Sequence, residues 1–272
     1  MAPRKRNYLN NRDLLKEIHK SKNSYCSYVN DTAEQYDIIV PQLEKINRNS
    51  ISQARKNRAE RLAKEAWETA LENGQSVKLD QFAIDPKTIK NTELVFRVIS
   101  YDHIPEAPGR KKNPKNVQDH YAKLNFPPFQ HYMLDEDGNP YCVGKSHWVG
   151  GMENGHFSLD HGKMTNKLAK MFMMMCERYG NKWNWRGYTY NDEMKSQALV
   201  QLAQVGLQFD ESKSQNPFAY YTATITNSFT RILNTEKKNQ NIRDDMLEMN
   251  GYNSSHSRQL DAHIQWKEDT GQ

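Results

Sequence analysis

Histidines gather in the middle of the chain, where residue types that bind metals are concentrated. Histidine, cysteine and aspartate side chains can hold zinc or the divalent metal of a nuclease site. No pair among them has a recurrent ligand spacing, and Cys142-x4-His147 stands alone. Scattered surface or packing histidines are therefore the preferred interpretation, with a metal-dependent nuclease or processing enzyme as the alternative. The residues concerned are His103, His120, His131, His147, His156 and His161, with Cys142, Asp135, Asp137 and Asp160.

Other catalytic chemistries leave no pattern in the sequence. There is no glycine-rich phosphate loop, no nucleophile elbow and no paired-carboxylate arrangement. We therefore expect no catalytic residue, no metal, no cofactor and no enzymatic activity. The three cysteines lie far apart, as in a reduced intracellular protein, and no apolar run approaches the ~18 residues of a membrane span. The net charge of +5 is compatible with a nucleic-acid partner.

The stretch 209–238 combines an apolar face with a polar one. Asn216 and Pro217 predict a helix start, because asparagine favours the N-cap and proline costs nothing at the first helical position. The apolar residues recur at helical spacing: Phe218, Tyr221, Ile225, Phe229, Ile232 and Leu233. Amides and hydroxyls suit bases, cations suit phosphates and a ring suits stacking, so the other face is typical of a helix laid against nucleic acid. That face holds Tyr220, Thr224, Asn227, Arg231, Asn234 and Lys238, and the alternative is an ordinary solvated face.

A second predicted helix, 191–208, carries an unusual stripe of amides. Met194, Ala198, Leu202 and Val205 are expected to pack inward. A purely solvated face would be served better by charged residues, so the stripe indicates a binding surface. Its members are Glu193, Gln197, Gln201, Gln204 and Gln208.

The sequence contains four separated motifs: YLNNRDLL (Tyr8 to Leu15), WNWRGYTYNDEM (Trp183 to Met194), FDESKSQNPFAYYT (Phe209 to Thr222) and the pair Phe229…Arg231-Ile232. In this order they resemble conserved region 2 of the sigma-70 family, and most closely the late-transcription sigma factors of T-even-type bacteriophages. The resemblance covers residues 8–20 and 160–245 and leaves the long stretch between them unexplained.

The resemblance implies binding to host core RNA polymerase. In sigma factors the helix corresponding to 191–208 binds the coiled coil of the polymerase β′ subunit. Glu193 and Gln197 match its acidic residue and the amide four positions later. Gln201 and Gln204 would extend this surface.

The resemblance also implies contact with promoter DNA. Region 2 aromatic residues capture bases that flip out when the −10 element opens, and a stacked base regains ~1–3 kcal/mol. Phe218 and Tyr221 take these positions, although the periodicity also places them on the apolar face. Thr224 and Ile225 stand where housekeeping sigma factors have paired tryptophans, which favours a simplified, AT-rich −10-like late promoter. The expected DNA contacts are Phe218, Tyr220, Tyr221, Thr224, Asn227, Arg231, Lys237 and Lys238.

The end of the chain departs from the family pattern. Late sigma factors carry a C-terminal hydrophobic-acidic motif that binds the sliding clamp, and here Leu260, Ile264 and Trp266 are the only, poorly fitting, candidates. Nothing after region 2 resembles the helix-turn-helix that reads a −35 element, in agreement with a separate activator. The expected partners are host core RNA polymerase and promoter DNA, with the phage sliding clamp and a late coactivator left open. The expected location is the cytoplasm of the infected bacterial host, with no membrane partner.

The elements that would position these residues are mainly helices. Helices are expected over 49–74 and 165–179, a strand over 91–101, and a hairpin over 130–149 with its turn at Asp135 to Asn139. The cations of 49–74 suggest either a solvated face or an accessory contact to DNA phosphates. The loop Arg110 to Lys115 would face DNA or polymerase, or be a plain surface loop.

The sequence thus predicts a mostly α protein: a sigma region 2-like helical bundle with a small α+β insertion of two or three strands. The predicted parts are an N-terminal arm and short helix (1–20), an insertion that is helical and then α+β (21–162), a sigma region 2-like helical domain (163–250) and a mobile C-terminal tail (251–272). A helical DNA-binding accessory protein that never touches polymerase is a further alternative to a sigma factor.

Overall fold

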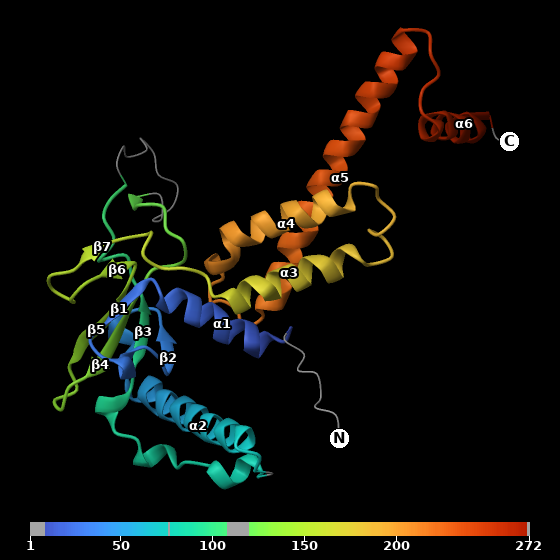
Figure 1. The fold of residues 1–272 in the computed structure, drawn as a ribbon. Coiled ribbons are helices and arrows are strands. Elements are labelled where there is room, and N and C mark those ends of the chain that lie inside the picture. Colours follow the sequence, from blue (N-terminus) through green and yellow to red (C-terminus); the bar gives the residue numbers. More distant parts are fainter. Residues whose placement is uncertain (1–8, 76, 108–119, 271–272) are drawn as a thin grey trace. The chain divides into compact units, whose positions relative to one another are not determined.

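The structure, a computed structural model, describes residues 9–75, 77–107 and 120–270 (Figure 1). The beginning of the predicted N-terminal arm and the loop Arg110 to Lys115 lie outside the described residues. The chain divides into two compact units. The first unit comprises Met1–Met171 and Val205–Phe218, and the second unit comprises Phe172–Gln204 and Ala219–Gln272.

The first unit is built on a five-stranded mixed sheet with strand order β1-β5-β4-β3-β2. β2 runs parallel to β3, and the other neighbours are antiparallel. A separate two-stranded sheet pairs β6 with β7. The strands are β1 (Cys26–Tyr28), β2 (Ile38–Val40), β3 (Phe96–Ile99), β4 (Phe129–Leu134), β5 (Pro140–Ser146), β6 (Trp148–Val149) and β7 (His156–Phe157).

The predicted hairpin is confirmed as β4 and β5. Gly138 has a φ of 87°, a conformation open to glycine because it lacks a Cβ, and its N–H donates to the Asp135 carbonyl at 3.1 Å. The Asp135 carboxylate accepts from the backbone N–H of Asn139 at 2.7 Å. These local bonds close the turn and set the register of the two central strands.

Two helices of the first unit begin at asparagine caps. α1 (Asn11–Asn23) begins after Asn10, whose side chain accepts from the backbone N–H of Asp13. α2 (Arg48–Glu72) begins with a reciprocal capping box between Asn47 and Ser50. The helix expected over 49–74 is therefore confirmed with small shifts at its ends. Short 3-10 turns occupy Asp31–Ala33, Leu43–Lys45, Leu79–Phe82, Pro86–Thr88, Asn91–Glu93 and Gly206–Gln208.

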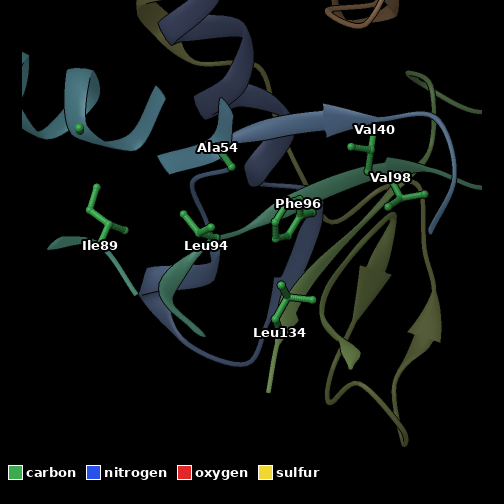
Figure 2. Close-up of a cluster of buried hydrophobic side chains, with 8 residues drawn as sticks. Val40, Ala54, Ile89, Leu94, Phe96, Val98 and Leu134 are labelled. Carbon is green, nitrogen blue, oxygen red and sulfur yellow. The ribbon is translucent and has the colours of Figure 1, made fainter. Parts of the chain in front are cut away.

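The main core of the first unit lies between α2 and the sheet (Figure 2). α2 contributes Ala54 and Ala59, whose small side chains let the helix pack closely beside β2. Phe96 is fully buried in this core. The members of the cluster are Val40, Ala54, Ala59, Ile89, Leu94, Phe96, Val98 and Leu134.

The arginines in the cationic first half of α2 largely form contacts within the first unit. Arg58 and Arg61 form ion pairs with Asp37 at 3.3 and 2.7 Å, and the Asp37 side chain is fully buried. Asp37 also accepts from the backbone N–H of Val95 at 2.9 Å. Two of the arginines considered for DNA phosphates thus anchor α2 to the strand region.

The second unit is helical. α3 (Asn166–Gly180) and α5 (Pro217–Met249) each begin in the first unit and continue into the second, while α4 spans Asn191–Val205 and α6 spans His256–Thr270. The tyrosine ring of Tyr221 packs edge-on against Phe172, with centroids 4.7 Å apart. The buried residues of this unit include Phe172, Met175, Cys176, Trp185, Met194, Ala198, Leu202, Tyr221, Ile225 and Phe229.

The predicted fold class is wrong. The chain has an α+β fold with a five-stranded mixed sheet, and a sigma region 2-like helical bundle is not what the structure shows. β1 and β2 escaped prediction because each has three residues, too few to reveal an alternating pattern. The predicted two or three strands were therefore only the central part of a larger sheet.

The C-terminal part contains two helices joined by a turn. α5 runs without a break to Met249, and α6 lies within the predicted C-terminal tail, 251–272. Polar contacts hold the turn between them: Ser255 donates its N–H and its hydroxyl to Asp244 at 2.9 and 2.7 Å. Arg258 forms ion pairs with Asp245 and Glu248. Apolar periodicity in the sequence does not predict a helix that is held by polar contacts of this kind.

Candidate nucleic-acid interface

One face of α5 carries an open groove of about 510 Å³. Its lining residues recur at intervals of three and four, so they form a single stripe along the helix. The opposite face is in the core, where Ile225 and Phe229 are almost fully buried. The groove is lined by Asn227, Thr230, Arg231, Asn234, Thr235 and Lys238.

The groove has the donors and charges that nucleic acids require. Asparagine amides can pair with base edges, hydroxyls can bind phosphate oxygens, and arginine and lysine can neutralise phosphates. No carboxylate lines the groove. Within the part of the chain that the structure describes, neither Arg231 nor Lys238 has an ion-pair partner. Both cations are exposed and available to an anionic ligand.

The structure brings three of the predicted DNA contacts, Asn227, Arg231 and Lys238, into this groove. Lys237 is exposed beside it. Thr230 and Thr235 also line the groove but were not predicted. Thr230 lies three residues after Asn227, and Thr235 lies four residues after Arg231. This helical spacing would have been enough to predict both threonines.

The other predicted contacts lie elsewhere on α5. Phe218, at its start, is 41% exposed, whereas Tyr221 is fully buried against Phe172. Tyr220 and Thr224 are half-buried, and the Thr224 hydroxyl donates to the Tyr220 carbonyl at 3.0 Å. The structure thus separates the two aromatic residues that the resemblance aligned with base capture.

The amide stripe of α4 lies at the surface of the second unit. Glu193 and Gln204 are exposed, and Gln197 and Gln201 are half-buried. Met194, Ala198 and Leu202 are fully buried, as the periodicity predicted. α4 therefore has a packed face and a polar face that is available to a partner.

The three clamp candidates lie on α6. Leu260, Ile264 and Trp266 are each about half exposed, at 49%, 47% and 51%. Residues four apart share a helix face, so Leu260 and Ile264 lie together while Trp266 points to another side. The Trp266 ring stacks on His263, with centroids 6.0 Å apart.

The histidine-rich middle is used for packing and hydrogen bonding. His131 is buried and accepts from Arg97 Nε at 2.9 Å, while its other ring nitrogen lies 2.7 Å from the Ala33 carbonyl. His147 is buried against the Phe126 ring, and burial lowers its pKa to about 3. Burial also lowers the pKa of His103 to about 4. Among the described residues, no group of three or more histidine, cysteine, aspartate or glutamate side chains is arranged to hold a metal ion.

None of the described helices is long and apolar enough to cross a membrane. No family model, curated protein or solved structure matches the chain. What the fold and the groove define is an α+β protein with a helical face suited to polyanions.

Proposed function

We propose that this protein is a sigma-type transcription initiation factor of a bacteriophage, which binds host core RNA polymerase and directs it to an AT-rich, −10-like late promoter. The observation that carries the proposal is the groove on α5, because it combines two amides, two hydroxyls and two cations without a carboxylate. The sequence motifs that resemble sigma factors support the same function.

Some of the groove residues would contact bases, and others would contact phosphates. Asparagine amides pair with adenine edges in the major groove, which suits Asn227 and Asn234 to an AT-rich element. Arg231 and Lys238 would neutralise phosphates and fix the register of the helix on DNA. Thr235 Oγ1 already donates its hydrogen to the Arg231 carbonyl at 3.0 Å. Toward a ligand, the Thr235 hydroxyl can therefore act only as a hydrogen-bond acceptor.

A second surface would hold the polymerase. Glu193, Gln197, Gln201 and Gln204 follow one face of α4, and in sigma factors the matching helix binds the β′ coiled coil. Both surfaces belong to the second unit. The protein would act in the cytoplasm of the infected host, and the sliding clamp and a late coactivator are further partners that the family suggests.

Run-off transcription with purified host core polymerase on phage DNA tests this proposal. The wild-type chain should give discrete initiation, and Arg231→Ala and a Glu193→Ala/Gln197→Ala double variant should each lose it while remaining folded. Lys267→Ala and a Gln265→Ala/Glu268→Ala double variant are matched controls, because these residues are exposed on α6. They should initiate like the wild type.

The outcomes separate the alternatives. Absence of both initiation and core association with the wild-type chain would contradict the proposal. DNA binding that survives without any polymerase association would favour a helical accessory protein. Metal-dependent cleavage of the template would favour the nuclease alternative.

A further inference from the structure

The loop between α3 and α4, residues 181–190, presents one tryptophan to solvent and buries another. Trp183 is 85% exposed, whereas Trp185 is 8% exposed. A large exposed indole gains little for folding, and such rings are enriched where proteins bind partners. Trp183 does not belong to the polar face of α5, so the role proposed for that face does not explain why the Trp183 ring is exposed.

The loop is held in a fixed conformation. The Asn191 side chain donates to the carbonyls of Gly180 and Trp185, each at 3.0 Å. The backbone N–H of Trp185 donates to the Lys182 carbonyl at 2.9 Å. These bonds tie both ends of the loop together, so Trp183 projects from an ordered frame and little entropy is lost when it binds a ligand.

The charge of the loop favours a polyanion. Residues 181–190 contain two cations, Lys182 and Arg186, and no carboxylate. Both cations are exposed. The Lys182 ammonium lies 4.2 Å from the centroid of the Tyr179 ring, which keeps its charge beside the loop.

The loop is a separate surface from the α5 groove. It packs on the buried side of α5, where Trp185 and Phe229 are in contact with ring centroids 5.3 Å apart. Phe229 points away from Asn227 and Arg231, because a residue two positions along a helix lies on nearly the opposite side. A ligand on Trp183 therefore does not occupy the groove.

We propose that the α3–α4 loop binds single-stranded nucleic acid, with the Trp183 indole as a stacking platform for a base and Arg186 beside a phosphate. An exposed aromatic ring flanked by cations is the arrangement that holds unpaired bases without reading their sequence. A duplex offers this ring no free base face, so the site selects single strands.

Fluorescence anisotropy with a labelled single strand of about 20 deoxythymidines and with a duplex promoter fragment tests the proposal on the full chain. Trp183→Ala should raise the dissociation constant for the single strand about 5- to 150-fold, and Trp183→Phe should retain most of the affinity. Trp183→Ala should leave the salt dependence unchanged, whereas Arg186→Ala should reduce its logarithmic slope by about 0.7. Tyr141→Ala, an exposed aromatic residue on β5, should bind like the wild type.

Single-strand binding that is equal in Trp183→Ala and the wild type, or absent from the wild type, would overturn the proposal. Loss of core-polymerase binding in Trp183→Ala with unchanged single-strand affinity would assign the loop to a protein partner instead. The proposed transcription function fails separately, when the wild type does not initiate or associate with core polymerase. Single-strand binding through Trp183 would then still stand.

Discussion

The ring of Trp185 stands edge-on to the ring of Phe229, with centroids 5.3 Å apart and planes at 74°. Tyr179 also packs against Phe229, at 5.1 Å, and its hydroxyl donates to Thr226 Oγ1 at 2.7 Å. These contacts join α3, the α3–α4 loop and α5. They place the exposed Trp183 and the groove on two sides of one packed unit.

Trp185→Ala should destabilise the second unit by ~3–5 kcal/mol, because it removes a buried aromatic ring and leaves a cavity beside Phe229. Hydrogen exchange across α3, α4 and α5 measures this loss in the unit itself. Trp183→Ala is the matched control and should change the exchange little, since Trp183 is 85% exposed. Equal protection in both variants would contradict the packing described here.

Arg231→Ala should weaken duplex binding at low salt and reduce the logarithmic salt slope by about 0.9, because one phosphate contact is lost. A double variant with Lys238→Ala should reduce the slope about twice as much. Titrations at several salt concentrations measure both slopes. Lys267→Ala should leave the slope unchanged, and a slope that stays constant in the double variant would exclude the groove as a phosphate site.

Buried Lys22 and partly buried Glu211 form an ion pair at 2.6 Å that joins residues 189 positions apart within the first unit. Lys22→Ala should cost ~3–5 kcal/mol of unfolding free energy, because Glu211 is left without its partner. A Lys22→Met/Glu211→Leu double variant should recover much of the loss. Denaturant titration gives these values, and Lys213→Ala, which breaks the exposed pair with Asp210, should cost at most about 1 kcal/mol.

The stability of the first unit should fall as the pH drops below about 6.5. Burial holds the pKa of His131 well below its usual value, with the Arg97 charge adding to the effect, and it lowers the pKa of His147 to about 3. The unfolded chain takes up protons on these histidines near pH 6.5 while the folded chain does not, so acid favours unfolding. Each histidine should contribute up to ~1.4 kcal/mol per pH unit between its two pKa values.

Hydrogen exchange of β3, β4 and β5 at several pH values, corrected for the intrinsic exchange rate, measures this dependence. His156→Gln should leave it unchanged, because His156 is exposed. A flat stability between pH 7 and 5 would show that the buried histidines are not held neutral.

Local patterns were sufficient to predict several individual elements of this fold. Apolar spacing predicted α2, Asn216 and Pro217 predicted the start of α5, and the Asp135 to Asn139 turn predicted the β4–β5 hairpin. These elements carry their signals within a few residues. The polar stripe of α5 was predicted in the same way, because helical spacing alone puts Asn227, Arg231 and Lys238 on one face.

Only the tertiary structure decided how those elements combine. β1 and β2 are three-residue strands whose place in the sheet depends on partners far along the chain. The ion pairs with Asp37 give Arg58 and Arg61 a structural role, and packing against Phe172 places Tyr221 in the core. The physical reason is that the types and spacing of side chains determine the local secondary structure. Whether a side chain is buried depends instead on which distant part of the chain packs against it.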